Sequence, residues 1–294
     1  MKEPVIEIYG NISYNTTFYK TNVYVIVGEV HVLEKVVLLI EDDTVILIKN
    51  GYYPYSSCLN KSVLIFDTGS SLFANNVYFV ACNYLNERVP ISDNGGLWFV
   101  GSSSNKDKDG INAYYSVNKS RFEAHKIYAY YLGSKDPLVQ NGNGNNNEPS
   151  TDNDGITILG CGNDEWKVQN LHIEESGDNA IDLVNSYITI CGIEVYYPGE
   201  DAINLQSSKL NVLENFKALV PLTNVYDRDI FDLEIDDGPS YLRLEQYCNV
   251  EILGIFGDQL KLVSDDLPQP TEKIYYYKGI TNNGQTYIHS VNSD

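Results

Sequence analysis

The stretch that decides the fold is NLHIEESGDNAIDLVNSYITI, residues 170–190, because a second version of it, GIEVYYPGEDAINLQSSKLNV, follows directly as residues 192–212. An offset of 22 residues brings positions of the same chemical kind together. So regular a repeat is typical of a solenoid, in which similar units stack on one another. The matched positions are Leu171 with Ile193, Ile173 with Val195, Gly177 with Gly199, Ala180 with Ala202, Ile181 with Ile203, Leu183 with Leu205, Ser186 with Ser208, Ile188 with Leu210 and Ile190 with Val212.

Each repeat holds three pairs of apolar residues that are two positions apart, for example Ile181 with Leu183. Alternation of this kind indicates three short strands per unit, with alternate side chains pointing inward. One unit cannot bury these side chains alone, whereas units stacked about 4.8 Å apart form a continuous core. The sequence therefore predicts an all-β fold, a single-stranded right-handed parallel β-helix with about ten rungs, on the hand of parallel crossover connections.

Strand patterns of the same kind extend to both sides of the repeat. Looser copies lie at 228–233, 240–244 and 250–262, and Ile40 and Phe66 suggest a longer period of 26 residues in the N-terminal half. We expect the long Asn-rich segment to be an exposed loop and the Asn-Asn-Gly near the C-terminus to be the turn of a hairpin that covers the last edge. The predicted organisation is one domain, 1–294, with N-terminal strands or a cap at 1–35, rungs at 36–263, a loop at 139–154 and a C-terminal hairpin or cap at 264–294.

The composition narrows the classes of partner. The 40 acidic and 20 basic side chains give a formal net charge of -20. This charge disfavours nucleic acid and anionic membrane surfaces, and no apolar run has the length of a membrane span. The five cysteines show no metal-ligand spacing, and buried free thiols are favoured over a bridge between Cys58 and Cys82.

Acidic residues recur at one bend of the repeat, before successive strands. Three interpretations stay open for this bend: each Asp caps a turn by accepting hydrogen bonds from backbone N–H groups, the carboxylates bind Ca²⁺, or they perform catalysis. A second row, Asp182, Asn204 and Asp232, is expected to be a polar ladder in solvent, and His172 a surface residue of a strand. The residues of the bend are Asp154, Asp178, Glu200, Asp201, Asp229 and Asp258, of which Asp178, Glu200, Asp201 and Asp229 are the candidate calcium ligands.

The turns at this bend resemble motifs of the pectin-lyase-like superfamily of right-handed parallel β-helices. DNDGITI (152–158) followed by SGDNAIDL (176–183) resembles the polygalacturonase pattern, although Asn179 stands in place of its second Asp. GEDAINLQ (199–206) resembles the calcium-binding turn of one pectate lyase family, with Gln206 where that family has Lys. If the resemblance extended to activity, Asp154, Asp178 and Asp201 would be its catalytic candidates.

A longer resemblance, over about residues 30–263, is to noncatalytic β-helix domains of bacterial surface proteins and of viral spike or capsid components. It rests on GGLWFVGSS (95–103), GITILGCG (155–162) and the acidic turns after them. It implies an extracellular rod on a cell or virion surface that lies beside protein neighbours or copies of itself, contacts polysaccharide through its tyrosines and requires no cofactor. The alternative is a lyase or glycoside hydrolase acting on a uronate polysaccharide, with Ca²⁺ to offset the charge of -20.

Overall fold

The computed structural model of this chain is built from β-strands. Every regular element in the residues it describes is a strand. Among these residues no helical segment has the length and the apolar character of a membrane span. The described residues are 3–49, 62–83, 85–88, 95–102, 118–134, 154–220, 228–234, 240–245, 248–254, 260–263, 273–276, 279–282 and 285–288.

Within the described residues the strands form two sheets, a large one of 16 strands and a small one of eight. The large sheet contains β1 (Val5–Tyr9), β2 (Thr16–Phe18), β3 (Val23–Val27), β5 (Val37–Ile40), β6 (Thr44–Lys49), β8 (Ser71–Phe73), β9 (Asn76–Cys82), β11 (Arg121–Tyr130), β13 (Trp166–Glu174), β15 (Tyr187–Tyr196), β17 (Lys209–Leu219), β19 (Tyr241–Leu244), β20 (Asn249–Leu253), β22 (Lys273–Tyr276), β23 (Gly279–Asn282) and β24 (Gln285–Ile288). The small sheet contains β4 (Glu29–Val32), β7 (Val63–Phe66), β10 (Leu97–Val100), β12 (Ile156–Leu159), β14 (Ile181–Val184), β16 (Ile203–Gln206), β18 (Arg228–Glu234) and β21 (Leu260–Val263).

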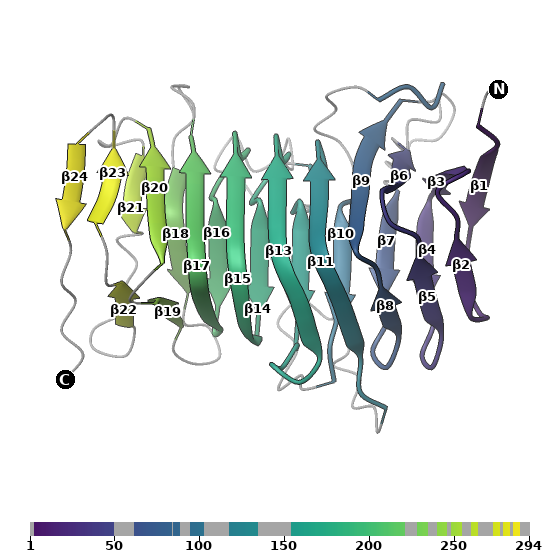
Figure 1. Cartoon of the computed structure of the whole chain (residues 1–294), viewed down its shortest axis with the longest axis horizontal. Helices are drawn as coiled ribbons and strands as arrows, with labels where there is room; N and C mark the ends of the chain where they lie inside the picture. Colours follow the sequence, from purple (N-terminus) through teal and green to yellow (C-terminus); the bar gives the residue numbers. More distant parts are fainter. Residues whose placement is uncertain are drawn as a thin grey trace, which may run out of the picture.

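Strands pair in parallel with their equivalents in the next repeat. Leu171 pairs with Ile193, Ile181 with Ile203 and Ile190 with Val212, as the repeat predicts. In Figure 1 the strands lie side by side along the long axis, with β1 and β24 at opposite ends of that axis. Parallel strands in two sheets with this order are compatible with a solenoid.

Two of the three predicted strands in each repeat are joined into one long strand. β15 runs from Tyr187 to Tyr196 and pairs along both of its halves with β17, with an irregularity between Ile190 and Gly192. The N-terminal halves of these long strands continue the row of β5 and β8, and their C-terminal halves continue the row of β6 and β9. Each long strand therefore spans both rows of the large sheet, and the junction between its two halves lies where the rows meet.

Buried serines connect the turns that follow the small sheet. Ser208 Oγ accepts a hydrogen bond of 2.9 Å from the backbone N–H of Ser186 and donates to the carbonyl of Leu183 at 2.8 Å. Ser240 repeats the pattern one turn later, accepting from Ser208 N–H at 3.1 Å. These side chains satisfy backbone groups that would otherwise be buried without partners, so the turns are held in register.

The interior is filled by rows of like side chains. Phe66 and Phe99 stack with their ring centroids 5.1 Å apart, and Phe99 meets the edge of Trp166 at 5.3 Å. These aromatic side chains are fully buried, as are the isoleucines and leucines that follow them along the stack. Large aromatic groups give the greatest burial of apolar area per residue, which makes this stretch the centre of the core.

The N-terminal part corrects one expectation. The proposed period of 26 residues is wrong, since Val32 pairs with Phe66 and Leu38 with Leu72, offsets of 34 residues. The longer offset arises because residues 50–61, which lie outside the described part, are added between β6 and β7. Parallel pairing already begins between β1 and β3, inside the segment 1–35.

The C-terminal part confirms the hairpin, with one change. β23 and β24 pair antiparallel, with Ile280 opposite Tyr287. Lys273–Tyr276, which was expected to belong to the hairpin, is instead β22 and pairs in parallel with β19. The predicted loop 139–154 lies outside the described residues except for its last residue, Asp154.

None of the cysteines that the structure describes forms a disulfide bond. Cys82, Cys161 and Cys248 are buried, and Cys191 is partly exposed. Cys82 therefore forms no bridge, which agrees with the favoured interpretation, while Cys58 lies outside the described residues.

Candidate functional site

The acidic bend is a connection between repeats. Asp154, Asn179 and Asp201 each lie two residues before a strand of the small sheet. Asp229 lies inside β18 and takes the equivalent position, two residues before Phe231, which pairs with Ile203. The N–H of Asp201 donates to Oδ1 of Asn179 at 3.0 Å, and the N–H of Asp229 donates to Oδ1 of Asp201 at 2.5 Å. Side chains in this row thus accept hydrogen bonds from the backbone of the following repeat, whereas the turn-capping interpretation placed these bonds within one turn.

The candidate calcium ligands fall into two different rows. Asp201 and Asp229 belong to the row above, while Asp178 and Glu200 stand one residue earlier in their repeats. The carbonyl of Asp178 accepts the N–H groups of Gly199 and Glu200 at 3.1 and 3.3 Å. In the part of the chain that the structure describes, no three His, Cys, Asp or Glu side chains are grouped so as to hold a metal ion. Asp258 lies outside that part.

Burial changes the acidity of this bend. Asp201 is only 6% exposed, and its burial, together with the nearby charges of Asp232, Glu200 and Asp229, raises its pKa to about 9. Burial also raises the pKa of Asp154 to about 7, even though Thr157 and Asn179 donate hydrogen bonds to it. Asp201 is therefore a neutral carboxylic acid at pH 7, and one of the formal negative charges is absent there.

The second polar row is not the solvated ladder that we expected. Thr157, Asp182, Asn204 and Asp232 pair in register on the outer face of the small sheet. Asp182 is 7% exposed and Asn204 4%, and Oδ1 of Asn204 has no hydrogen-bond partner among the residues that the structure describes. Period-two alternation tells which face of a strand a side chain takes, but it does not tell what covers that face, which is why the expectation was wrong.

A groove opens on the large sheet where the pairing of adjacent strands is interrupted. β11 pairs with β13 from Phe122 and Trp166 onward, and β15 pairs with β17 from Tyr187 onward. Between β13 and β15, both fully described, pairing starts only at Asn170 with Gly192. The N-terminal halves of β13 and β15 therefore face one another without ladder hydrogen bonds.

The groove, with a volume of about 780 Å³, lies over this interruption and extends to β11 and to Ala74 and Asn75, which connect β8 and β9. Its lining includes the cations Arg121 and Lys167, the ring of His125 and the amide of Gln169. Thr189 and Cys191 of β15 border it on the opposite side. None of Asp154, Asp178 and Asp201 lines the groove, so the predicted acidic residues and the groove occupy different corners of the fold.

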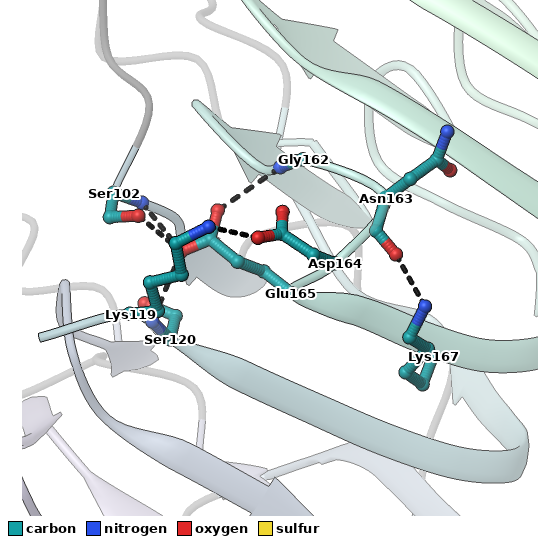
Figure 2. A network of polar contacts seen from close by, with 8 residues as sticks. All are labelled: Ser102, Lys119, Ser120, Gly162, Asn163, Asp164, Glu165 and Lys167. Carbon is teal, nitrogen blue, oxygen red and sulfur yellow. Dashed lines mark hydrogen bonds and ion pairs between the residues drawn. The ribbon is translucent and has the colours of Figure 1, made fainter.

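A buried glutamate holds the turn that precedes β13. Glu165 is 1% exposed and accepts hydrogen bonds from Ser102 N at 3.0 Å, Ser102 Oγ at 2.5 Å, Ser120 N at 3.0 Å and Gly162 N at 3.1 Å. Figure 2 shows this carboxylate at the centre of the network, with the ion pair of Lys119 and Asp164 beside it. The turn, residues 160–165, is longer than its equivalents 185–186 and 207–208, and it comes directly before the half of β13 that pairs with β11 but not with β15.

The charged groups of the groove are weakly engaged. Arg121 makes an exposed ion pair with Glu123 at 2.7 Å and lies 4.9 Å above the ring of Phe73. Lys167 Nζ donates to the carbonyl of Asn163 at 2.6 Å. His125 Nδ1 contacts Oε1 of Gln169 at 2.9 Å, which makes this nitrogen the donor.

Aromatic side chains line the outer surface of the row formed by β9 and by the C-terminal halves of β11, β13 and β15. Tyr78 and Tyr128 stack at 4.4 Å, and His172 lies between Tyr128 and Tyr196 at 5.4 and 5.2 Å. Their faces meet one another, so this tyrosine row presents ring edges and hydroxyl groups rather than open ring faces. His172, expected at the surface of a strand, is 16% exposed in its side chain and bonds Glu194 at 2.8 Å.

The hydrogen bonds of this row also fix its charges. Burial by itself raises the pKa of Glu194, but hydrogen bonds from His172 and from Lys126 outweigh it and lower the pKa below its ordinary value. Burial raises the pKa of Tyr130 to about 12, with Glu174 adding to the effect. Glu194 is therefore ionised and Tyr130 is a neutral hydroxyl donor at pH 7.

Sequence patterns pointed to the acidic bend and missed the groove. Arg121, Lys167 and Glu165 were not singled out, because isolated charged residues in strands carry no signature. The feature that marks this place is a longer connection within the repeat, since six residues separate β12 from β13, whereas two separate β14 from β15.

Comparison with protein-family models, with curated proteins and with solved structures finds no match to this chain.

Proposed function

We propose that this chain is a right-handed parallel β-helix of the pectin-lyase-like kind that serves as a noncatalytic attachment rod. It would be exposed on a cell or virion surface, beside protein neighbours or copies of itself, and would contact carbohydrate. The repeated, in-register parallel pairing and the antiparallel strand β24 at the C-terminal end support a rigid stack with a protected edge.

The observation that carries the noncatalytic part is the use made of the acidic bend. Asn179 and Asp201 accept backbone hydrogen bonds from the next repeat, and Asp201 is neutral at pH 7. A carboxyl group that is buried and bonded to the backbone is a structural connector, whereas a general acid or base must reach a substrate. This supports the structural interpretation of the bend over the polygalacturonase-like one.

Carbohydrate contact is supported by the outer surface of the large sheet. The groove offers amide, hydroxyl and cationic groups from β11, β13 and β15, and the tyrosine row presents hydroxyl groups beside it. Sugars are bound through many hydrogen bonds of this kind, made by fixed groups on rigid strands.

A polysaccharide lyase is the second candidate function, and one observation favours it. Arg121 and Lys167 line the same groove, and β-elimination beside a uronate needs a basic group together with cations that offset the carboxylate. Calcium at the acidic bend stays a prediction, and the rod itself requires no cofactor.

Both candidates are separated by one experiment on the whole chain. Binding is measured on an array of neutral, uronate and sulfated glycans, and the bound glycans are then assayed for reducing ends and for the ultraviolet absorbance of unsaturated uronates, with and without Ca²⁺. We expect binding without new ends or absorbance. Cleavage would replace the attachment function by an enzymatic one, and the absence of binding to every glycan would refute carbohydrate contact.

A further inference from the structure

We propose that the groove between β13 and β15 binds a negatively charged oligosaccharide, with Arg121 and Lys167 on its anionic groups. The inference rests on the proposed attachment function and adds to it the site and the charge class of the ligand. A carboxylate and a sulfate are the two sources of such charge in glycans, and both present oxygens to guanidinium and ammonium groups.

The charge of the groove lining is opposite in sign to the net charge of the chain. The chain as a whole has twice as many acidic as basic side chains, 40 against 20. The groove lining has the opposite balance, with Arg121 and Lys167 against the single carboxylate of Glu123. A concave region with low-dielectric walls concentrates the field of its charges, so the groove favours an anion although the net charge of the chain is negative.

Arg121 and Lys167 are accessible to a ligand in the groove. The side chain of Arg121 is 59% exposed, and its ion pair with Glu123 is of the exposed kind that contributes little to stability. Lys167 gives one hydrogen bond to a carbonyl, and an ammonium group has three donors, so two remain for a ligand. Both side chains stand on neighbouring strands, since Glu123 of β11 pairs with Lys167 of β13.

The neighbouring acidic residues Asp164 and Glu165 already interact with other groups of the protein. Asp164 is in an ion pair with Lys119, and hydrogen bonds from Lys119 lower its pKa. Glu165 is buried and takes its hydrogen bonds from Ser102, Ser120 and Gly162, away from solvent. Glu165 is therefore held inside the protein, the exposed carboxylate of Asp164 is offset by its ion pair with Lys119, and Glu123 is the acidic side chain in the groove lining.

The geometry of the interruption favours a sugar over a peptide strand. An inserted strand would need the distance between β13 and β15 to double from about 4.8 Å. The same two strands pair from Asn170 and Gly192 onward, and β12 and β14 pair in full on the other side of the turn. Opening of the slot is thus limited at both ends, and a ligand lies over it, in contact with the side chains that line the groove.

The test is isothermal titration of the full chain with three hexasaccharides of similar size: a galacturonate hexamer, a sulfated hexamer and neutral maltohexaose. The anionic peptide hexaglutamate is titrated in the same way. The variants are Arg121→Gln with Lys167→Gln, and Arg121→Lys as a variant that keeps the charge. The matched control is Arg243→Gln. Arg243 of β19 lies outside the groove and forms an ion pair with Glu245, two residues later, as Arg121 does with Glu123. Thermal unfolding of each variant checks that the fold is retained.

We expect an anionic hexamer to bind, the double variant to weaken binding at least about tenfold, Arg121→Lys to retain most of it, and Arg243→Gln to leave it unchanged. Preference for the galacturonate or the sulfated hexamer identifies the source of charge, and binding should weaken as salt is raised. Equal binding of maltohexaose, or anionic binding that the double variant does not change, would overturn the inference while leaving carbohydrate attachment intact. Tighter binding of hexaglutamate than of either anionic hexamer would show a peptide site instead, and binding of no glycan would overturn both proposals.

Discussion

Oδ1 of Asp201 accepts a hydrogen bond of 2.5 Å from the backbone N–H of Asp229, one repeat further along the chain. The same position one repeat earlier is Asn179, whose Oδ1 accepts from Asp201 N–H at 3.0 Å. An aspartate and an asparagine thus perform the same task, which requires an acceptor oxygen and not a charge. This equivalence separates a structural role of the acidic bend from a catalytic or metal-binding one.

Replacing Asp201 tests this role. Asp201→Ala leaves the buried N–H of Asp229 without its acceptor and is expected to lower the free energy of unfolding by about 1–3 kcal/mol. Asp201→Asn keeps the acceptor and should be close to the wild type. Urea unfolding followed by circular dichroism measures both, with exposed Glu214→Gln as the control. Equal losses in the Ala and Asn variants would show that the charge matters and contradict the connector role.

The raised pKa of Asp201 predicts a dependence of stability on pH. Its pKa is about 9 in the folded state, against about 3.9 in an unfolded chain. Between these values the folded state holds the proton that the unfolded state has lost, so the free energy of unfolding falls as pH rises. Asp154, with a pKa of about 7, acts in the same direction up to that pH.

Stability curves from pH 5 to pH 10 check this prediction. The wild type should lose stability up to about pH 9, and Asp201→Asn should lose less over pH 7 to 9, where Asp154 no longer contributes. Groups with lowered pKa, such as Glu194, titrate below this range and do not affect the comparison. Identical slopes in the two proteins would mean that Asp201 is ionised at neutral pH.

Glu165 should be among the least replaceable side chains near the groove. Glu165→Ala removes the acceptor for three backbone N–H groups and is expected to cost more than about 3 kcal/mol, because each bond to a buried carboxylate contributes roughly 1.5–3 kcal/mol. Hydrogen exchange should accelerate at Ser102, Ser120 and Gly162 before it does so in β16 or β17. Uniform acceleration throughout the described strands would argue against a local role in shaping the groove.

Close approach of successive turns makes one glycine essential. A Cβ added to Gly199 would lie 2.2 Å from the carbonyl oxygen of Gly177, which is backbone and cannot turn away. Gly199→Ala should therefore lower the unfolding temperature far more than Gly10→Ala, where no atom lies within 4 Å and only the left-handed φ of 63° opposes a side chain. Similar shifts for the two variants would show that the turns at Gly177 and Gly199 are less tightly stacked than described.

The central repeats could be predicted from the sequence because their pairing follows directly from a constant offset. Leu171 with Ile193 and Leu183 with Leu205 are matched in sequence and paired in the structure. The offset fails in the N-terminal half, where the additional residues between β6 and β7 lengthen it, so Ile40 and Phe66 were matched wrongly. A repeat predicts pairing only while the lengths of the connections stay constant.

The site was less predictable than the fold. The acidic bend is visible because Asp and Asn recur there, but the burial of Asp182 and Asn204 depends on what covers the outer face of the small sheet. The groove arises where Arg121 and Lys167 meet through the stacking of two strands, which no local motif encodes. Both features are tertiary, and a periodic pattern holds no information about them.

The central claim is that the chain binds a glycan without cleaving it. Native mass spectrometry of the full chain with a galacturonate or sulfated hexasaccharide tests it most directly, because one spectrum reports both the complex and the mass of the sugar in it. The account predicts a complex that carries the intact hexasaccharide and a free sugar of unchanged mass after long incubation. Shorter or unsaturated sugars would identify an enzyme, and a spectrum that shows only the free protein would refute attachment to that class of glycan.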